Sequence, residues 1–127
     1  MRTPRETVTQ FLDLTSPKDR DIDSLLPQIA TMLADGFVFT GPLMRVEGRA
    51  NYLDLLRKFI CVHVGLTIRR QFADGDDVCS INDLVVRSPA GALVTMPMAE
   101  WFRVKDGVIY AHDIFYDPRE FAKAFGM

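Results

Sequence analysis

The second half of the chain carries four consecutive β-strand patterns with no helical pattern between them. Turn sequences rich in Gly, Pro, Asp and Ser separate the patterns. The predicted strands cover residues 66–72, 78–87, 93–104 and 108–116. Consecutive strands joined by tight turns pair as an antiparallel meander, so this half of the chain is predicted to be a sheet. Pro97 lies inside the third strand and has no amide hydrogen to donate, which predicts an edge or a bulge at that point.

The first half is predicted to be mainly helical. The segment Thr3-Pro4-Arg5-Glu6 has the sequence of a capping box, and apolar residues recur behind it at helical spacing until Ser16. A second helix is predicted within residues 22–33. Pro27 either kinks this helix or opens a second short one, and Gly36 is predicted to stop it.

Three further elements complete the expected order. They are a short strand over residues 37–40, a third helix that starts at Gly48, and a last helix opened by Asp117-Pro118. Helices followed by a run of strands indicate an α+β fold, and 127 residues are enough for one domain, residues 1–127. Because long antiparallel strands curl, the helices can cover the hollow side of the sheet.

Several predicted strands are apolar on both faces. In the strand over residues 78–87, Cys79, Ile81 and Val85 alternate with other apolar residues, namely Val78, Leu84 and Val86. A sheet with one face in water would be polar on that face. We therefore expect the outer face to be covered, most simply by a second copy in a homodimer.

Composition narrows the possible partners and the location. The net charge of −2 implies no basic face, so nucleic acid is not an expected partner. No run approaches the roughly 18 apolar residues of a membrane helix, and the start of the chain lacks the apolar region of a signal peptide. We expect a cytoplasmic protein in which Cys61 and Cys79 are free thiols, with no metal and no organic cofactor.

Two stretches resemble a known superfamily. Residues 99–109 followed by Phe115-Tyr116-Asp117-Pro118 are similar to the last two strands of SnoaL-like proteins, relatives of ketosteroid isomerases and limonene epoxide hydrolases. Residues 39–42 followed by Glu47-Gly48-Arg49 resemble the first strand and third helix of the same NTF2-like group. The resemblance implies a cystatin-like or NTF2-like fold: a curved antiparallel or mixed sheet forms a cone, with the N-terminal helices packed on its concave face. It also implies a pocket for a small apolar organic molecule, although this fold supports many chemistries.

The resemblance also shows which functional residues are missing. Where ketosteroid isomerases have a tyrosine and a catalytic aspartate, this chain has Phe11 and Gly41, whereas Glu100 matches the protonated aspartate that is their second oxyanion donor. Steroid isomerisation is therefore not expected. Of the two epoxide hydrolase aspartates, one corresponds to Ile114 and the other to Asp83, and the arginine two residues before the second is Ile81 here.

Hairpin register decides which residues face the pocket. A two-residue turn at Asp106-Gly107 places Glu100 opposite Asp113, whereas a three-residue loop places it opposite His112. The resemblance favours the second choice and implies that Glu100, His112 and Ile114 point inward. Phe102 would then pair with Tyr110, also inward, and the outward residues would be Trp101, Arg103, Asp113 and Phe115.

The turn at residues 88–91 leaves two alternatives for the preceding strand. A loop of two or four residues brings Cys79, Ile81 and Asp83 to the face of Glu100, whereas a loop of three residues brings Ser80 and Asn82 there. A bulge at Pro97 could reverse either outcome. We favour Asp83 as the inward residue.

These residues give a hypothesis for the site. The candidate catalytic residues are Glu100, His112 and Asp83, and the candidate substrate-binding residues are Tyr110, Phe102, Ile114, Phe11, Tyr116 and Met98. A carboxylic acid kept protonated by burial could donate to a carbonyl or epoxide oxygen, with the histidine as base. This chemistry suits a cofactor-free isomerase, cyclase or hydrolase.

Other interpretations remain open. Glu100 and His112 could instead form a cross-strand ion pair that only satisfies two half-buried groups. The domain would then be a non-catalytic binding protein or a protein–protein interaction module. His63, close to a helix–strand junction, is expected at the surface or as a helix cap.

Overall fold

One curved sheet of six strands is the framework of the protein. The computed structural model describes residues 2–16 and 21–127. The strand order is β2-β1-β6-β5-β4-β3, in which β1 and β6 are parallel and the other neighbours antiparallel. The strands are β1 (Leu33–Thr40), β2 (Arg45–Glu47), β3 (His63–Asp74), β4 (Asp77–Arg87), β5 (Leu93–Lys105) and β6 (Val108–Phe115). The helices are α1 (Pro4–Thr15), α2 (Ile22–Ala30), α3 (Arg49–Phe59) and α4 (Arg119–Ala124). The fold is therefore α+β with a curved mixed sheet, as predicted.

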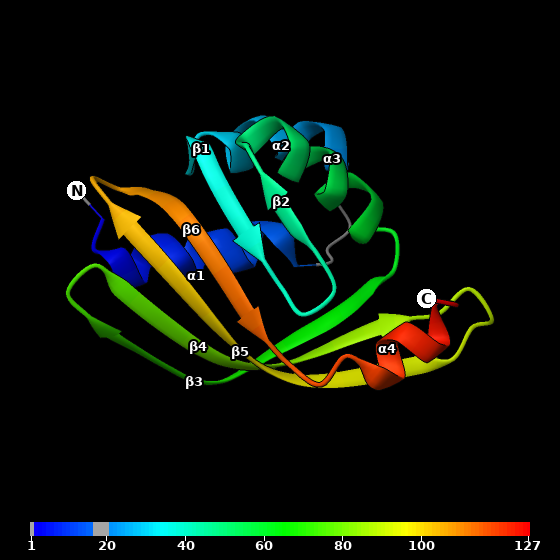
Figure 1. Cartoon of the computed structure of the whole chain (residues 1–127). Helices are drawn as coiled ribbons and strands as arrows, with labels where there is room; N and C mark the ends of the chain where they lie inside the picture. The colour runs from blue at the N-terminus through cyan, green and yellow to red at the C-terminus, as the bar shows by residue number, and fades with distance from the viewer. Residues whose placement is uncertain (1, 17–20) are drawn as a thin grey trace.

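The N-terminal helices occupy the concave side of the sheet (Figure 1). The long helix α1 runs across β3–β6, while α2 and α3 lie over β1, and α4 returns near the far end of β5. No helix among the described residues is long and apolar enough to cross a membrane.

The capping box at the start of α1 forms as predicted. The amide of Glu6 donates to Thr3 Oγ1 (3.1 Å), and the amide of Thr3 donates to a carboxylate oxygen of Glu6 (2.9 Å). The bond from the Thr3 amide lowers the pKa of Glu6, because the ionised carboxylate is the better acceptor. The predicted first helix is confirmed, including its end at Ser16.

The segment after α1 differs from the prediction at one point. Pro27 lies inside α2 and neither ends nor divides it. Gly36 does not stop a helix, because α2 ends at Ala30 and β1 already begins at Leu33. The pairing of β1 with β6 shifts between Leu33 and Val38, so the exposed residues Asp35 and Gly36 lie in an irregular part of the strand.

The β5–β6 hairpin combines a tight turn with a bulge. Asp106 (φ 52°) and Gly107 (φ 77°) form a two-residue turn with both residues at positive φ, the geometry of type I′ turns. Val104 pairs with Ile109 and Arg103 with Ala111, so Tyr110 is an extra residue in β6. Neither predicted pairing is found.

The bulge nevertheless keeps the expected faces for most of the hairpin. Glu100 lies opposite Ile114 and Phe102 opposite His112. Trp101 and Asp113 pair on the outer face, as predicted. The prediction that Tyr110 points inward is wrong, because the bulge leaves this residue 41% exposed.

The β4–β5 connection decides between the two alternatives for β4. The amide of Ser88 donates to the carbonyl of Ala92 (2.8 Å), so three residues lie between them. Ser80 consequently lies opposite Glu100, and Asn82 lies opposite Met98 on the inner face. The preference for Asp83 is therefore wrong.

Pro97 lies in the part of β5 that extends beyond β6. The pairing of β5 with β6 ends at Ala99 and Phe115, so residues 93–98 pair only with β4 among the described strands. Pro97 is exposed, and the β4 ladder continues past it without a shift. The edge alternative predicted for this proline is confirmed.

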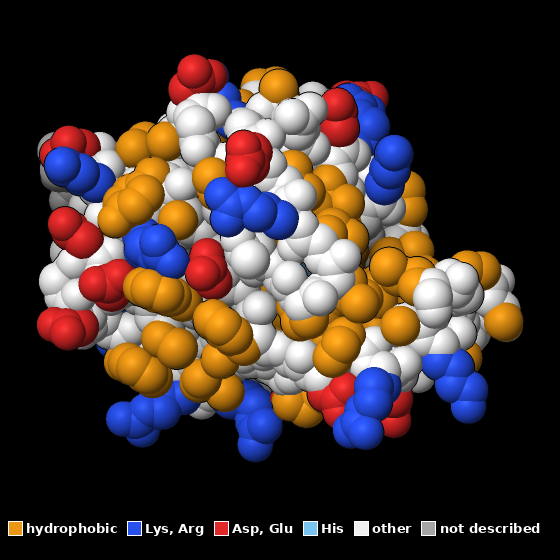
Figure 2. Space-filling view, viewed as in Figure 1, with side chains coloured by type: hydrophobic (Ala, Val, Ile, Leu, Met, Phe, Trp, Pro, Cys, Tyr) orange, Lys and Arg blue, Asp and Glu red, His pale blue; other side chains and the backbone are white. Residues whose placement is uncertain are grey.

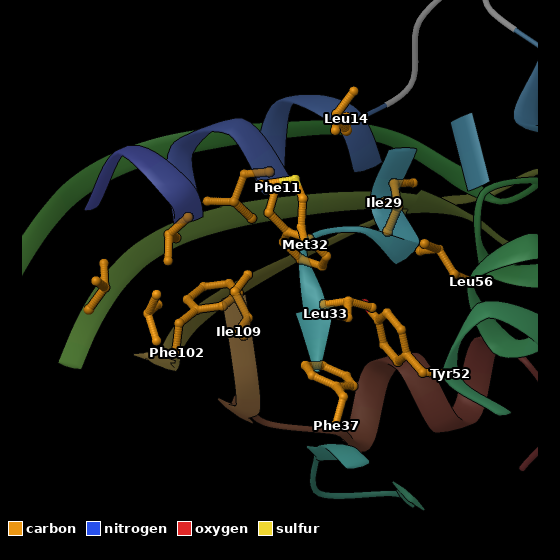
Figure 3. Packing of buried hydrophobic residues seen from close by; sticks show 14 of the residues in the cluster. Phe11, Leu14, Ile29, Met32, Leu33, Phe37, Tyr52, Leu56, Phe102 and Ile109 are labelled. Carbon is orange, nitrogen blue, oxygen red and sulfur yellow. The ribbon is translucent and has the colours of Figure 1, made fainter. Parts of the chain in front are cut away.

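Two apolar clusters lie between the helices and the sheet. The larger one joins α1, α2 and α3 to the inner faces of β1, β5 and β6, and Figure 3 shows Phe37 and Tyr52 packed together within it. The smaller one is formed by inward residues of β4 and β5 and is flanked by α4. Burial of a large apolar side chain stabilises a fold by about 1.5–3 kcal/mol, so these clusters fix the helices on the sheet.

Candidate functional site

A cavity of about 150 Å³ lies between the two apolar clusters, since residues of both line it. Its walls come from α1, α3, the strands β1 and β3–β6, the connection between β1 and β2, and the segment around α4. Most lining side chains are apolar: Phe11, Leu12, Phe39, Leu43, Met44, Leu55, Leu56, Phe59, Leu66, Leu84, Met96, Met98, Ile114 and Phe121. The few polar groups are therefore placed among surfaces that cannot hydrogen bond.

A buried carboxylate–imidazole pair lies at the sheet side of the cavity. His112 Nε2 and Glu100 Oε1 are 2.9 Å apart, and both residues line the cavity. Only 6% of Glu100 and 4% of His112 is exposed. When Glu100 is ionised, Nε2 carries the hydrogen and donates it to the carboxylate.

A chain of polar side chains connects Glu100 with the surface. Asn82 Nδ2 donates to the second oxygen of Glu100, and Asn82 Oδ1 accepts from the hydroxyl of Ser80 (2.7 Å). Ser80 Oγ in turn accepts from Gln71 Nε2 (3.4 Å), and Thr9 donates to Gln71 Oε1 (2.9 Å). All donors point toward the carboxylate, so the chain stabilises its ionised form.

Aromatic rings hold the His112 imidazole in place. Phe102 stacks on it with ring centroids 4.0 Å apart, while Phe11 and Phe39 contact it edge-on at 6.1 and 5.3 Å. His112 Nδ1 is buried and has no hydrogen-bond partner among the described residues. The ring therefore has one satisfied nitrogen, on the side of Glu100, and one enclosed nitrogen.

Six of the nine predicted site residues line the cavity. They are Glu100, His112, Met98, Phe11, Ile114 and Tyr116. Burial raises the pKa of the Tyr116 hydroxyl, so this group is protonated at neutral pH.

The other three lie elsewhere. Asp83 is on the outer face of β4, where its carboxylate is 3.5 Å from the Arg69 guanidinium. Tyr110 is exposed at the bulge, and Phe102 is fully buried behind His112 without lining the cavity. The prediction that Phe102 contacts substrate directly is therefore not supported, and its contact is with the imidazole.

His63 is a cavity residue that the sequence interpretation missed. It is 8% exposed at the start of β3, and its Nδ1 donates to the carbonyl of Thr15 (3.2 Å), in the last turn of α1. The expected surface position is wrong, although the bond does satisfy a carbonyl at a helix end. Burial lowers the pKa of His63, and the bond to the carbonyl of Thr15 offsets this only in part.

Tyr52 is the second missed residue. It lies on the inner side of α3, four residues before Leu56, and its ring packs against Phe37 and Phe39 at 4.8 and 5.6 Å. Burial raises the pKa of the Tyr52 hydroxyl, and the negative charge of Glu100 raises it further. The helical spacing from Tyr52 to Leu56 was a signal for this inward position.

Metal ligands do not gather in the described part of the chain. Within residues 2–16 and 21–127, no group of three or more His, Cys, Asp or Glu side chains is arranged to hold a metal ion. Cys61 and Cys79 are both free.

The α+β fold combines a curved sheet, helices on its concave side and an apolar cavity with one polar pair. These features define a class of cone-shaped, pocketed domains. The family described as SnoaL-like domain matches residues 8–112, so the chain belongs to the SnoaL-like family. No match was found among curated proteins.

Several solved structures share this fold over nearly the whole chain. An NTF2-like protein from Cytophaga hutchinsonii ATCC 33406 has a TM-score of 0.78 at 23% identity, with 95% of this chain and 96% of that chain covered. An NTF2-like protein from Burkholderia pseudomallei K96243 reaches a TM-score of 0.81 at 14% identity and covers 100% of both chains. An LEH-like epoxide hydrolase from M. tuberculosis has a TM-score of 0.77 at 20% identity, covering 96% of this chain and 88% of that chain. At these identities the likeness concerns the fold.

Proposed function

We propose that the cavity binds a small, largely apolar molecule and that Glu100 and His112 transfer a proton to or from it. The observation that supports this proposal is a hydrogen-bonded carboxylate–imidazole pair (2.9 Å) in an otherwise apolar cavity. Such a pair suits a cofactor-free isomerase, cyclase or hydrolase. The epoxide hydrolase among the fold relatives is consistent with the last of these.

The proposed chemistry follows from the positions of the protons on Glu100 and His112. In the resting state Glu100 is a carboxylate that accepts from Asn82 and from His112 Nε2–H. Each carboxylate oxygen keeps a further lone pair and can take a proton from the ligand. The added proton then rests on Glu100, and His112 Nε2–H donates to the resulting neutral acid. Its return to a different ligand atom completes an isomerisation.

Paired substitutions test this proposal. Glu100→Gln and His112→Asn remove the ionisable groups, while Asp83→Asn changes a carboxylate on the outer face and serves as the matched control. In an assay of small carbonyl and epoxide compounds, we expect the first two variants to lose at least about 100-fold in kcat, the scale of general acid–base catalysis. Asp83→Asn should keep the rate of the unaltered protein. Full turnover by Glu100→Gln would show that the pair is not catalytic.

A second candidate function is ligand binding without catalysis. Both oxygens of Glu100 already accept hydrogen bonds, and His112 Nδ1 is enclosed, which also suits a purely structural pair. Mass spectrometry of the purified protein would identify any ligand that copurifies. Recovery of that ligand unchanged after prolonged incubation would favour this function over catalysis.

We further propose that the outer sheet face binds a second copy of the chain. The large apolar residues exposed on this face include Phe72, Trp101 and Phe115. Figure 2 shows apolar side chains gathered at the lower left, where β4, β5 and β6 lie in Figure 1.

The presence of a cavity counts against the interaction-module alternative, which predicts a filled interior. A cytoplasmic location stays a prediction.

A further inference from the structure

The cavity contains polar groups that neither the Glu100 chain nor the proposed proton transfer uses. His63 Nε2 is buried without a hydrogen-bond partner among the described residues. The hydroxyl of Tyr52, on a residue that is 6% exposed and lines the cavity, has no partner in that part of the chain either, but it is not fully enclosed. A buried polar atom without a partner has a free-energy cost, and native structures contain few of them. The enclosed Nε2 of His63 and the unpaired hydroxyl of Tyr52 in one cavity therefore indicate that a bound molecule supplies their partners.

The hydrogen-bonding role of His63 is fixed by its surroundings. Its Nδ1 is 3.2 Å from the carbonyl oxygen of Thr15, which can only accept, so Nδ1 carries the hydrogen. The Thr15 hydroxyl does not compete, since it donates to the carbonyls of Phe11 (3.0 Å) and Leu12 (3.3 Å). Burial keeps the imidazole neutral, so Nε2 of this cavity-lining residue carries a lone pair and can accept a hydrogen bond.

The hydroxyl of Tyr52 has the complementary role. Its ring is held by Phe37 and Phe39, and burial keeps the phenol protonated. A phenolic hydroxyl in an apolar wall is a good donor to an oxygen of the ligand. The cavity thus offers one acceptor and one donor that a single oxygen-bearing ligand can use.

The size and lining of the cavity limit the ligand further. A volume of about 150 Å³ is comparable with that of engineered apolar cavities that bind benzene. No Lys or Arg side chain lines the cavity, so an anionic ligand would have no cation to pair with. The ligand is consequently neutral and has about the bulk of one substituted ring.

We infer that the cavity selects uncharged, ring-sized molecules that carry a hydroxyl group, with the hydroxyl hydrogen bonded to His63 Nε2 and Tyr52 donating to a ligand oxygen. Phenols are the simplest members of this class. His63 and Tyr52 are then specificity residues for the same cavity, so this inference rests on the proposed binding of a small apolar molecule.

The test compares phenol with toluene, in which a methyl group replaces the hydroxyl. The dissociation constants of both are measured by calorimetry or NMR titration for the full-length protein and three variants. In His63→Asn the side-chain amide can still donate to the Thr15 carbonyl, but the acceptor at the position of Nε2 is lost. Tyr52→Phe removes a single oxygen, and Asp83→Asn, on the outer face of β4, is the control.

The informative quantity is the ratio of the toluene and phenol dissociation constants, because general changes in the cavity affect both ligands. We expect His63→Asn to lower this ratio about tenfold and Tyr52→Phe to lower it several-fold, the effect of one lost hydrogen bond. Asp83→Asn should leave it unchanged. If His63→Asn does not fold, the ratio measured for Tyr52→Phe alone tests the inference.

Two results would overturn the inference, and they differ in what else they affect. If toluene binds but the ratio is the same in all folded variants, hydroxyl selection is wrong and the proposed binding of apolar molecules stands. If neither compound binds to the unaltered protein, both the inference and the proposed cavity function fail.

Discussion

Asn82 occupies the central position in the polar chain that supports Glu100, and its replacement by leucine should destabilise the protein strongly. The side chain is fully buried, donates to the carboxylate and accepts from Ser80. Leucine has a similar volume, so the substitution removes hydrogen bonds without opening a large cavity. The bond to the charged group contributes about 1.5–3 kcal/mol and the neutral bond about 1 kcal/mol. We therefore expect the free energy of unfolding to fall by about 3 kcal/mol.

Urea and thermal denaturation measure this effect. For a domain of this length, a loss of that size corresponds to a decrease in Tm of roughly 12 °C. The same substitution in a Glu100→Gln background should cost at least about 1 kcal/mol less, because the acceptor is then neutral. Equal costs in both backgrounds, within about 0.5 kcal/mol, would refute the argument that Asn82 stabilises a buried carboxylate.

Three other predictions concern different parts of the molecule. Because burial lowers the folded-state pKa of His63, the unfolded chain binds more protons below about pH 6.5, and stability should fall as the pH decreases through that value. Urea denaturation between about pH 8 and 5 should show a smaller loss for His63→Asn, and parallel losses would contradict this reasoning. Trp101→Asp should give a monomeric mass by light scattering, whereas a monomeric mass of the unaltered protein at micromolar concentration would disprove the dimer. Gly107→Ala should cost about 1 kcal/mol in thermal denaturation because φ is 77° there, while Gly36→Ala, with open space around it, should be nearly neutral.

The helices and the meander from β3 to β6 could be predicted from local signals. The capping box at Thr3 needs only residues three positions apart, and turn sequences mark the ends of the strands. Gly36 misled the prediction because glycine at an irregular strand position has the same local signature as glycine after a helix.

Which residues face the cavity depends on the parity of loops and bulges. In the β5–β6 hairpin a two-residue turn and the extra residue Tyr110 add to an odd number, so Glu100 and His112 keep a common face although their pairing differs from the prediction. In the β4–β5 connection a loop one residue different from the favoured one exchanged Asp83 for Asn82. The sequence around residues 88–91 allowed both outcomes.

The inward position of His63 depends on a long-range contact. Its partner is the carbonyl of Thr15, which is 48 positions away in the chain. Backbone carbonyls have no sequence signature, so no spacing rule could have linked these two residues. Tyr52 was more accessible to prediction, because the helical repeat with Leu56 already indicated the buried side of α3.

Pro97 has a consequence for how the protein behaves at high concentration. Beyond the end of β6, one side of β5 has no neighbouring strand among the described residues, and such an edge is a template on which another chain can add a strand. The ladder to β4 is unbroken at Pro97, so the position of the missing amide hydrogen is on the open side. If another strand were added at this edge, one of its backbone carbonyls would have no amide hydrogen to accept from. The proline thus protects the protein from edge-to-edge aggregation in the part of β5 that does not pair with β6.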